Sequence, residues 1–361
     1  MKKNNIGIMT FHDAINYGAA LQTYALNKYI NNLNYNCETI DYKCDYIENS
    51  YKILNINIKD IKGTANSILN VRNNVIRKNK FNKFLKNNVK ISQLKYNSNN
   101  IWQSNSKYNT FIVGSDQVWN IDLCADFNYF LPFVNSKNER VSFAASFGDI
   151  NIINRNGKII KKELEKYKKI SIRELSSVNR LKEELQITAE NVLDPVFLLD
   201  KKEWLKVANK KAENQKYILL YILHEESAYK IADKISNETG LNILIITQSR
   251  KKRVNGKYIR NAGPEEFISL IANSEYVITD SFHGTALSII FGKNLKVVLK
   301  KENLFLNERL MSILNLFNLE ECIVNEESSI ADLLQTTDYK DKEENINSEI
   351  EKTKKFISDV I

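Results

Sequence analysis

The chain has 361 residues, of which 43% are hydrophobic and 26% are charged, and its formal net charge is +9. This composition is typical of a soluble globular enzyme, and no apolar run approaches the roughly 18 residues of a membrane-spanning helix, which excludes a transmembrane class. The length exceeds what one hydrophobic core usually organises, so we expect two domains of similar size.

The N-terminus and the cysteines favour a cytoplasmic protein. Residues 1–5 are basic, but the apolar stretch after them ends at His12 and Asp13, so we do not expect a signal peptide. The cysteines lie too far apart for a CxxC metal or redox motif and are interpreted as reduced thiols; they are Cys37, Cys44, Cys124 and Cys322. No cluster of metal ligands is visible, so we predict neither a metal nor a cofactor.

The positive charge is compatible with nucleic acid, an anionic membrane surface or an anionic substrate. The densest basic stretches, residues 72–90 and 155–169, carry apolar residues at helical spacing, which favours the solvated faces of amphipathic helices. A peripheral contact with the inner face of a membrane is the second interpretation of these stretches. No nucleic-acid-binding module accompanies the charge, so we predict no nucleic-acid partner.

The N-terminal region predicts the opening of a Rossmann-like domain. Residues 6–11 form an apolar strand, residues 12–18 a polar loop and residues 19–30 a helix, and a second strand follows at 37–42. The GxGxxG fingerprint is absent from the loop, so we do not predict a dinucleotide cofactor.

A polar stretch rich in Asn and Lys, at about 45–105, is predicted to be a helical insertion. The strand that follows it, residues 110–113, leads into a loop with Asp116, Gln117 and Trp119. A carboxylate, an amide and an indole on one turn suit a sugar, because Trp stacks on C–H faces while the polar groups take hydroxyls. The alternative interpretation is that Trp119 packs under the sheet.

Two further strands, at 141–145 and 169–174, flank the basic helix and precede another helix at 175–184. Arg173 lies at the carboxyl end of the second strand, where a guanidinium can hold a carboxylate or a phosphate. The alternative is a structural ion pair between Arg173 and Glu174 or another acid.

From residue 216 the alternation of strands and helices restarts, which predicts a second Rossmann-like unit. The expected elements are strands 216–223, 242–247, 276–279 and 295–299, and helices 226–239, 264–274 and 284–291. We predict an N-terminal domain over 1–190 that binds the acceptor, a C-terminal domain over 191–335 that binds the donor, and a helical tail over 336–361 that packs back on the first domain. Two such halves facing a cleft resemble the α/β architecture of GT-B glycosyltransferases.

The most informative stretch runs from residue 276 to 292, where a strand gives way to a polar loop and then a helix. His283 lies at this transition beside Asp280, Ser281 and Thr285, and in such sheets the strand ends and helix starts attract anions. The alternative is a core or helix-capping histidine. Arg309, ahead of a later helix, is a further cationic candidate.

Several of these stretches together resemble the polysaccharide pyruvyl transferase family. The similar segments follow one another in the family's order; they are residues 16–26, 111–120, 142–148, 171–174, 193–195, 280–284 and 307–309. The resemblance implies transfer of the enolpyruvyl group of phosphoenolpyruvate to a sugar of a cell-surface polysaccharide or its lipid-linked or nucleotide-linked precursor, with formation of a pyruvate ketal and release of phosphate.

The resemblance also implies roles for individual residues, with Arg173 and His283 binding phosphoenolpyruvate. Together with the chemistry of the loops, it leads us to predict His283 as general acid and Asp116 as base, with Asp280 as an alternative partner that orients His283. The predicted substrate-binding residues are Asn16, Tyr17, Gly18, Ser115, Gln117, Trp119, Arg173, Asp280, Ser281, Phe282, Gly284 and Arg309.

The chain departs from some family members at Ser281, where they carry an arginine. Either Arg309 or another basic residue replaces that cation, or the donor is different. The competing hypotheses are a glycosyltransferase of the same architecture that uses a nucleotide sugar, and a glycan-binding protein without catalytic activity.

Overall fold

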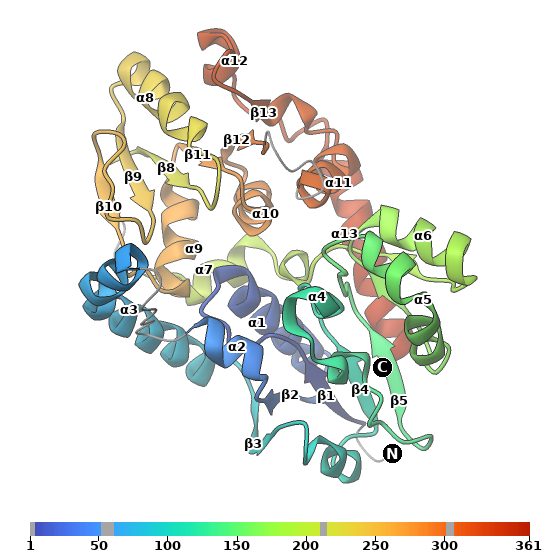
Figure 1. Cartoon of the computed structure of the whole chain (residues 1–361). Helices are drawn as coiled ribbons and strands as arrows, with labels where there is room; N and C mark the ends of the chain where they lie inside the picture. The colour runs from blue at the N-terminus through green and yellow to red at the C-terminus, as the bar shows by residue number, and fades with distance from the viewer. Residues whose placement is uncertain (1–3, 52–60, 210–214, 301–306) are drawn as a thin grey trace. The chain divides into compact units, whose positions relative to one another are not determined.

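The computed structural model describes residues 4–51, 61–209, 215–300 and 307–361 (Figure 1). The chain divides into two compact units. Unit 1 contains residues 1–52, 82–199 and 347–361, and unit 2 contains residues 53–81 and 200–346. The boundary at residues 199/200 keeps the segment after residue 190 with the N-terminal unit.

Unit 1 is built on a parallel sheet with the order β3-β2-β1-β4-β5. Its strands are β1 (Asn5–Met9), β2 (Asn36–Tyr42), β3 (Ile91–Tyr96), β4 (Thr110–Val113) and β5 (Glu139–Ser142). Short strands β6 (Ser171–Ile172) and β7 (Glu190–Asn191) pair with each other, and single bridges join Val141 to Lys169 and Ala145 to Ile172 beside β5. The carboxyl ends of β1, β4 and β5 therefore share one edge of this sheet.

Helices cover the sheet of unit 1. They are α1 (Tyr17–Asn32), α2 (Asp45–Ser50), the end of α3 (Ile61–Asn88), α4 (Ile121–Cys124), α5 (Asn151–Leu164), α6 (Leu175–Leu185) and α13 (Glu343–Val360), with 3-10 turns at Ile101–Ser106, Phe127–Phe130 and Pro195–Leu198. Phe356, Ile357 and Val360 of α13 pack in one buried cluster with Ile6 and Ile8 of β1. Helix α13 thus contributes to the core of unit 1 (Figure 1).

Unit 2 contains a six-stranded parallel sheet with the order β10-β9-β8-β11-β12-β13. Its strands are β8 (Tyr217–Tyr221), β9 (Asn242–Ile246), β10 (Lys257–Ile259), β11 (Tyr276–Thr279), β12 (Asn294–Val298) and β13 (Ile323–Val324). Its helices are α7 (Lys201–Val207), α8 (Ser227–Thr239), α9 (Pro264–Asn273), α10 (Phe282–Phe291), α11 (Glu308–Leu316) and α12 (Ile330–Leu334), with a 3-10 turn at Glu320–Cys322. The central strands β8 and β11 are buried along their whole length, which explains their uninterrupted apolar sequences.

The sequence located the central strands and missed the edge strands β3, β10 and β13. Strands 110–113 and 276–279 have the predicted bounds. The insertion at about 45–105 is helical through α2 and α3, but residues 91–96 form the edge strand β3, so the expectation of a wholly helical insertion is wrong there. An edge strand buries little of its surface, and β3 is accordingly polar, with exposed residues at three of its six positions.

No helix in the described part of the chain is both long enough and apolar enough to span a membrane.

Candidate functional site

In unit 1 the loops that follow β4 and β5 carry strained backbone at the edge of the sheet. Asp116 has a φ of 84° and Ala144 a φ of 53°, which are costly for residues other than glycine. The Asp116 carboxylate accepts a hydrogen bond of 2.8 Å from the backbone N–H of Gln117. Gly148, with a φ of 71°, lies so close that an added Cβ would be 2.2 Å from Gln117 Oε1. Such close packing fixes the position of the Asp116 turn.

Arg173 lies at the end of β6 in a buried network of carboxylates. Its Nε is 3.1 Å from Glu174 Oε1, and its Nη1 is 2.9 Å from Asp194 Oδ2. Burial acts to lower the pKa of Arg173, but the carboxylates of Glu174, Asp194 and Asp116 outweigh it, and the net effect raises this pKa above its ordinary value. The site therefore holds a permanent cation whose side chain is only 3% exposed.

Hydroxyl groups from two strand ends complete this network. Ser115 Oγ donates to Asp194 Oδ2 at 2.7 Å, and Ser146 Oγ donates to Glu174 Oε1 at 2.8 Å. The ion pair with Glu174, which was the alternative interpretation of Arg173, is present. Sequence reasoning named Glu174 as a partner of Arg173 but missed Asp194 and Ser146, although each lies in a segment that carries the family resemblance.

Trp119 does not form a sugar platform, and the prediction that it binds substrate is corrected. Its side chain is fully buried, stacks on Phe130 at an interplanar angle of 12° and contacts Phe147 and Tyr167. Its Nε1 donates to the carbonyl oxygen of Tyr129 at 3.1 Å. Both the rings and the polar atom are used in packing, so Trp119 supports the loop from beneath.

The segment predicted at residues 16–18 begins helix α1. Asn16 is the N-cap, and its side chain accepts a hydrogen bond from the backbone N–H of Ala19, while Tyr17 and Gly18 are buried in the first turn. Thr10 Oγ1, just after β1, donates to the carbonyl oxygen of Ser115 at 2.8 Å. These contacts join the carboxyl ends of β1 and β4.

His12, in the loop after β1, forms a buried pair with Asp41. This pair was not singled out from the sequence. His12 Nε2 is 3.3 Å from Asp41 Oδ1 at the end of β2, and Lys43 Nζ is 3.1 Å from the same oxygen. Burial acts to raise the pKa of Asp41, but His12 and Lys43 outweigh it, and the net effect lowers this pKa to about 2. The signal that could have identified His12 is its position directly after the first predicted strand.

In unit 2 the start of α10 carries the predicted His283. Helix α10 begins at Phe282, with Ser281 as N-cap accepting from the backbone N–H of Gly284 at 3.4 Å. An added Cβ at Gly284 would lie 2.6 Å from Thr279 Oγ1, so only glycine allows the helix to approach β11 this closely. His283 lies in the first helical turn and is 8% exposed. Ser281 thus has a structural role that an arginine could not fill.

Asp280 organises the loop that follows β8. Its carboxylate accepts backbone hydrogen bonds from Leu223 at 2.7 Å, from His224 at 2.7 Å and from Glu225 at 2.9 Å. Both oxygens are engaged by these amides. The structure therefore gives Asp280 the role of fixing the 223–225 loop next to the end of β11, and it shows no hydrogen bond from Asp280 to His283 among the described residues.

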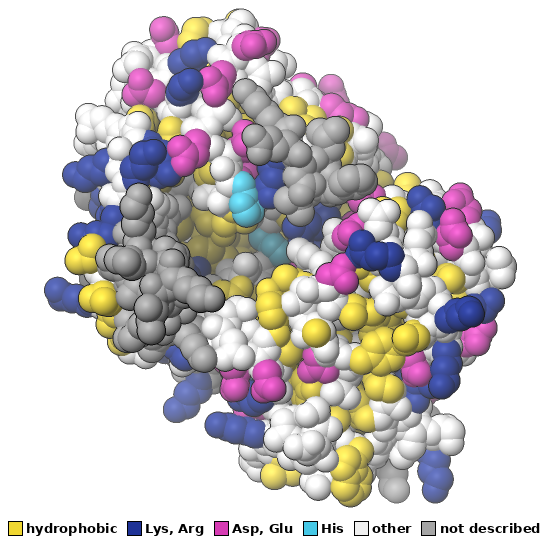
Figure 2. Space-filling model, in the orientation of Figure 1, with side chains coloured by type: hydrophobic (Ala, Val, Ile, Leu, Met, Phe, Trp, Pro, Cys, Tyr) yellow, Lys and Arg dark blue, Asp and Glu magenta, His cyan; other side chains and the backbone are white. Residues whose placement is uncertain are grey.

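Three basic side chains gather near Asp280. Burial and the charges of Lys300 and Arg309 lower the pKa of His224, and burial together with the charge of Arg309 lowers the pKa of Lys300. Figure 2 shows histidine and Lys or Arg side chains next to each other on the visible face. Sequence reasoning named Arg309 but missed His224 and Lys300, although each directly follows a predicted strand.

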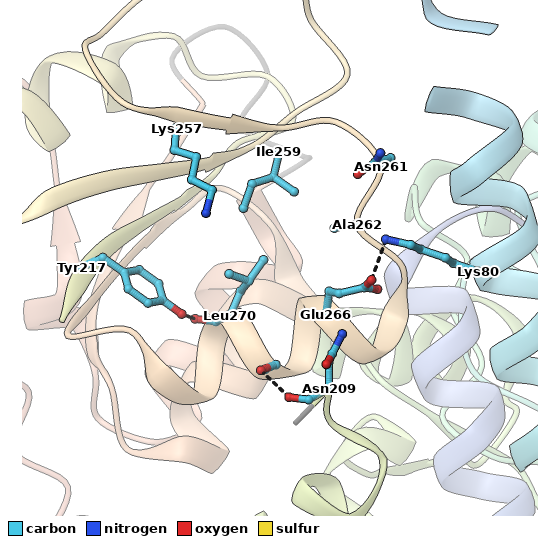
Figure 3. Close-up of a pocket in the computed structure, with 10 residues that line it drawn as sticks. Lys80, Asn209, Tyr217, Lys257, Ile259, Asn261, Ala262, Glu266 and Leu270 are labelled. Carbon is cyan, nitrogen blue, oxygen red and sulfur yellow. Dashed lines mark hydrogen bonds and ion pairs between the residues drawn. The ribbon is translucent and has the colours of Figure 1, made fainter. Parts of the chain in front are cut away.

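Pockets occur at two places in the described part of unit 2. One, of about 240 Å³, is bordered by Lys80, Tyr217, Lys257, Glu266 and Leu270, with an ion pair of 2.5 Å between Lys80 and Glu266 (Figure 3). It contains no predicted site residue. The other, of about 330 Å³, lies at the carboxyl ends of β12 and β13; its lining includes Ser227, Val298, Lys300, Val324 and Glu327. In the described ranges, no group of three or more His, Cys, Asp or Glu is placed to hold a metal ion.

Comparison with known proteins gives one matching family. The family model described as "Polysaccharide pyruvyl transferase" matches residues 16–295. No curated protein matches the chain.

Solved structures show a similar fold. UDP-GlcNAc 2-epimerase from Methanocaldococcus jannaschii has a TM-score of 0.51 at 14% identity, covering 96% of this chain and 91% of that chain. A putative UDP-N-acetylglucosamine 2-epimerase from Listeria monocytogenes has a TM-score of 0.51 at 12% identity, covering 97% and 91%. At such identities the likeness concerns the fold alone, and it confirms the predicted α/β, GT-B-like class with a parallel sheet in each domain.

Proposed function

Because the chain belongs to the polysaccharide pyruvyl transferase family, we propose that this transferase moves the enolpyruvyl group of phosphoenolpyruvate onto a sugar of a cell-surface polysaccharide or of its precursor. Two sugar hydroxyls form bonds to C2 of the enolpyruvyl group and lose their protons, C3 takes up one proton, and the C2–O bond to phosphate breaks, with the second proton leaving on the phosphate. The product is a cyclic ketal that carries a carboxylate, and inorganic phosphate leaves.

The observation that carries the proposal is the placement of His283 in the first turn of α10. The amides of a helix start stabilise bound anions, and an imidazolium at the same point can both pair with phosphate and deliver a proton. In this proposal His283 protonates the methylene carbon and Ser281 keeps the helix start in place.

Residues of unit 1 take the other roles. Arg173 offers a permanent cation for the carboxylate or phosphate, since its surrounding acids keep it charged. Asp116 offers a carboxylate on a rigid turn and acts as base for the attacking sugar hydroxyl. We place the protein in the cytoplasm, where phosphoenolpyruvate is available, with a peripheral membrane contact when the acceptor is lipid-linked. The proposed chemistry needs no metal or cofactor.

Calorimetric titration of phosphoenolpyruvate into the purified full-length protein tests the donor. We expect saturable binding that His283→Ala weakens by at least tenfold, because one charge-assisted hydrogen bond is worth roughly 1.5–3 kcal/mol. Ile290→Ala, near the other end of α10, is the matched control and should bind like the wild type. Binding of a uridine diphosphate sugar with no binding of phosphoenolpyruvate would overturn the assignment in favour of a glycosyltransferase.

A further inference from the structure

Three neighbouring strands of unit 2 end in polar residues that converge at one edge of the sheet. The order β8-β11-β12 places the residues after these strands side by side, namely His224, Asp280 and Lys300. The backbone of Lys300 is held in place because its N–H donates to Asn307 Oδ1 at 2.9 Å and its carbonyl oxygen accepts from Asn307 Nδ2 at 2.9 Å. Asn307 directly precedes α11, whose first turn carries Arg309.

This edge of the sheet carries both acidic and basic side chains. Asp280 and Glu225 face the basic groups His224, Lys300 and Arg309, but both oxygens of Asp280 already accept backbone amides. Among the described residues, neither the Lys300 ammonium nor the His224 ring has a hydrogen-bond or ion-pair partner. Burial and the charge of Arg309 lower the pKa of both groups, and the charge of Lys300 also lowers the pKa of His224. Repulsion among such positive charges destabilises the protein without ligand, and a bound anion reduces this repulsion.

We propose that Lys300 and His224, together with Arg309, bind the phosphate group of the donor and thereby supply the positive charge that is absent at Ser281. This inference rests on the proposed function for the identity of the donor. The side chains of the cluster by themselves indicate a site for phosphate or a phosphate ester. Lys300 also borders the pocket of about 330 Å³ at the ends of β12 and β13, which provides space next to this side chain.

The cluster predicts that the protein takes up a proton when phosphate binds. His224 has a lowered pKa in the empty protein because burial and the charges of Lys300 and Arg309 disfavour its cation, while Asp280 and Glu225 favour it. A bound phosphate adds negative charge and raises this pKa, so His224 takes up a proton when phosphate binds near neutral pH. The affinity of the wild-type protein should therefore rise as the pH falls, beyond the change that the phosphate's own titration produces.

Calorimetric titrations with inorganic phosphate and with phosphoenolpyruvate test the site. Lys300→Gln should weaken the binding of both ligands by about tenfold to a hundredfold. Lys216→Gln is the matched control, because it removes the same charge just before β8, at the opposite edge of the sheet, where Lys216 pairs with Glu275 at 2.9 Å. His224→Asn, which removes the titrating ring, should reduce the pH dependence of the phosphate affinity relative to the wild type. Circular dichroism confirms that each variant is folded.

The outcomes separate this inference from the proposed function. If phosphoenolpyruvate binds equally well to wild type, Lys300→Gln and His224→Asn, the cation site is refuted and the donor assignment stands. Phosphate binding that Lys300→Gln weakens, without any binding of phosphoenolpyruvate, supports the site and refutes the donor. If the wild type binds neither ligand, both are refuted.

Discussion

At the scale of single residues, the candidate site in unit 1 combines a strained backbone at Asp116 with a buried Arg173 whose charge is neutralised by carboxylates. Asp116 keeps a positive φ although the residue has a Cβ, and its carboxylate contributes to the field that keeps Arg173 charged. Asp194 and Glu174 bind the same guanidinium from within the core. Because buried ion pairs contribute little net stability, while breaking one is costly, we attribute this network to positioning.

Two substitutions of Asp116 distinguish the effect of its backbone strain from its proposed role as base. Asp116→Gly relieves about 1 kcal/mol of backbone strain and loses one hydrogen bond of similar strength, so we expect an unfolding free energy within about 1 kcal/mol of the wild type. Asp116→Asn retains the hydrogen bond to Gln117 without the charge. If Asp116 acts as base, both variants should reduce turnover by about a hundredfold or more. Chemical denaturation and phosphate release in the presence of acceptor measure the two effects, and near-wild-type turnover of Asp116→Asn would refute the role as base.

At the scale of elements, the start of α10 joins a cap, a glycine contact and a histidine within four residues. Ser281 accepts from Gly284, and Gly284 allows the helix to pack closely on Thr279 of β11. The geometry of His283 therefore depends on neighbours that do no chemistry themselves. The place occupied by arginine in some relatives is here used to cap the helix.

Removal of the N-cap of α10 should measurably lower the unfolding free energy. Ser281→Ala is expected to lower the unfolding free energy by about 1 kcal/mol, because the backbone N–H of Gly284 loses its side-chain acceptor. The control is Ser288→Ala on the same helix, whose hydroxyl donates to the carbonyl oxygen of Gly284, a group that also belongs to the helix ladder. We expect a smaller loss for this variant. Equal losses in urea denaturation would argue that Ser281 does not act as a cap.

At the scale of the whole molecule, the C-terminal helix returns to the unit in which the chain began. Phe356 of α13 is 2% exposed and belongs to the same buried cluster as the central strand β1. Its ring also lies 4.7 Å from Lys169 Nζ. The last helix is thus part of the core of unit 1, although all of unit 2 after residue 200 precedes it in sequence.

Truncation of Phe356 should affect one unit selectively. Phe356→Ala is expected to cost about 3–5 kcal/mol in the stability of unit 1, through lost burial and the cavity that remains. Amide hydrogen exchange should accelerate in β1 and β4, whereas exchange in β8 and β11 should stay at wild-type rates. Lys355→Ala, at an exposed neighbouring position, is the control. Equal acceleration in both sheets would contradict the assignment of α13 to unit 1.

The sequence by itself determined the alternation of strands and helices, the family, and the position of His283 shortly after β11. These features are local, because side-chain periodicity and turn residues are set by the few residues around them. The same local rules failed at the edge strand β3, which buries too little surface to leave an apolar pattern. They also left Trp119 between two interpretations that only burial could separate.

The tertiary structure decided which distant residues meet. Asp194 reaches Arg173, Asp280 holds the loop around His224, and the order β8-β11-β12 brings Lys300 to the same edge. Strand order and the burial of ion pairs depend on contacts between remote segments, and a single sequence carries no direct record of them. The physical reason is that a charge acquires its role from the groups that surround it in space, and not from its neighbours along the chain.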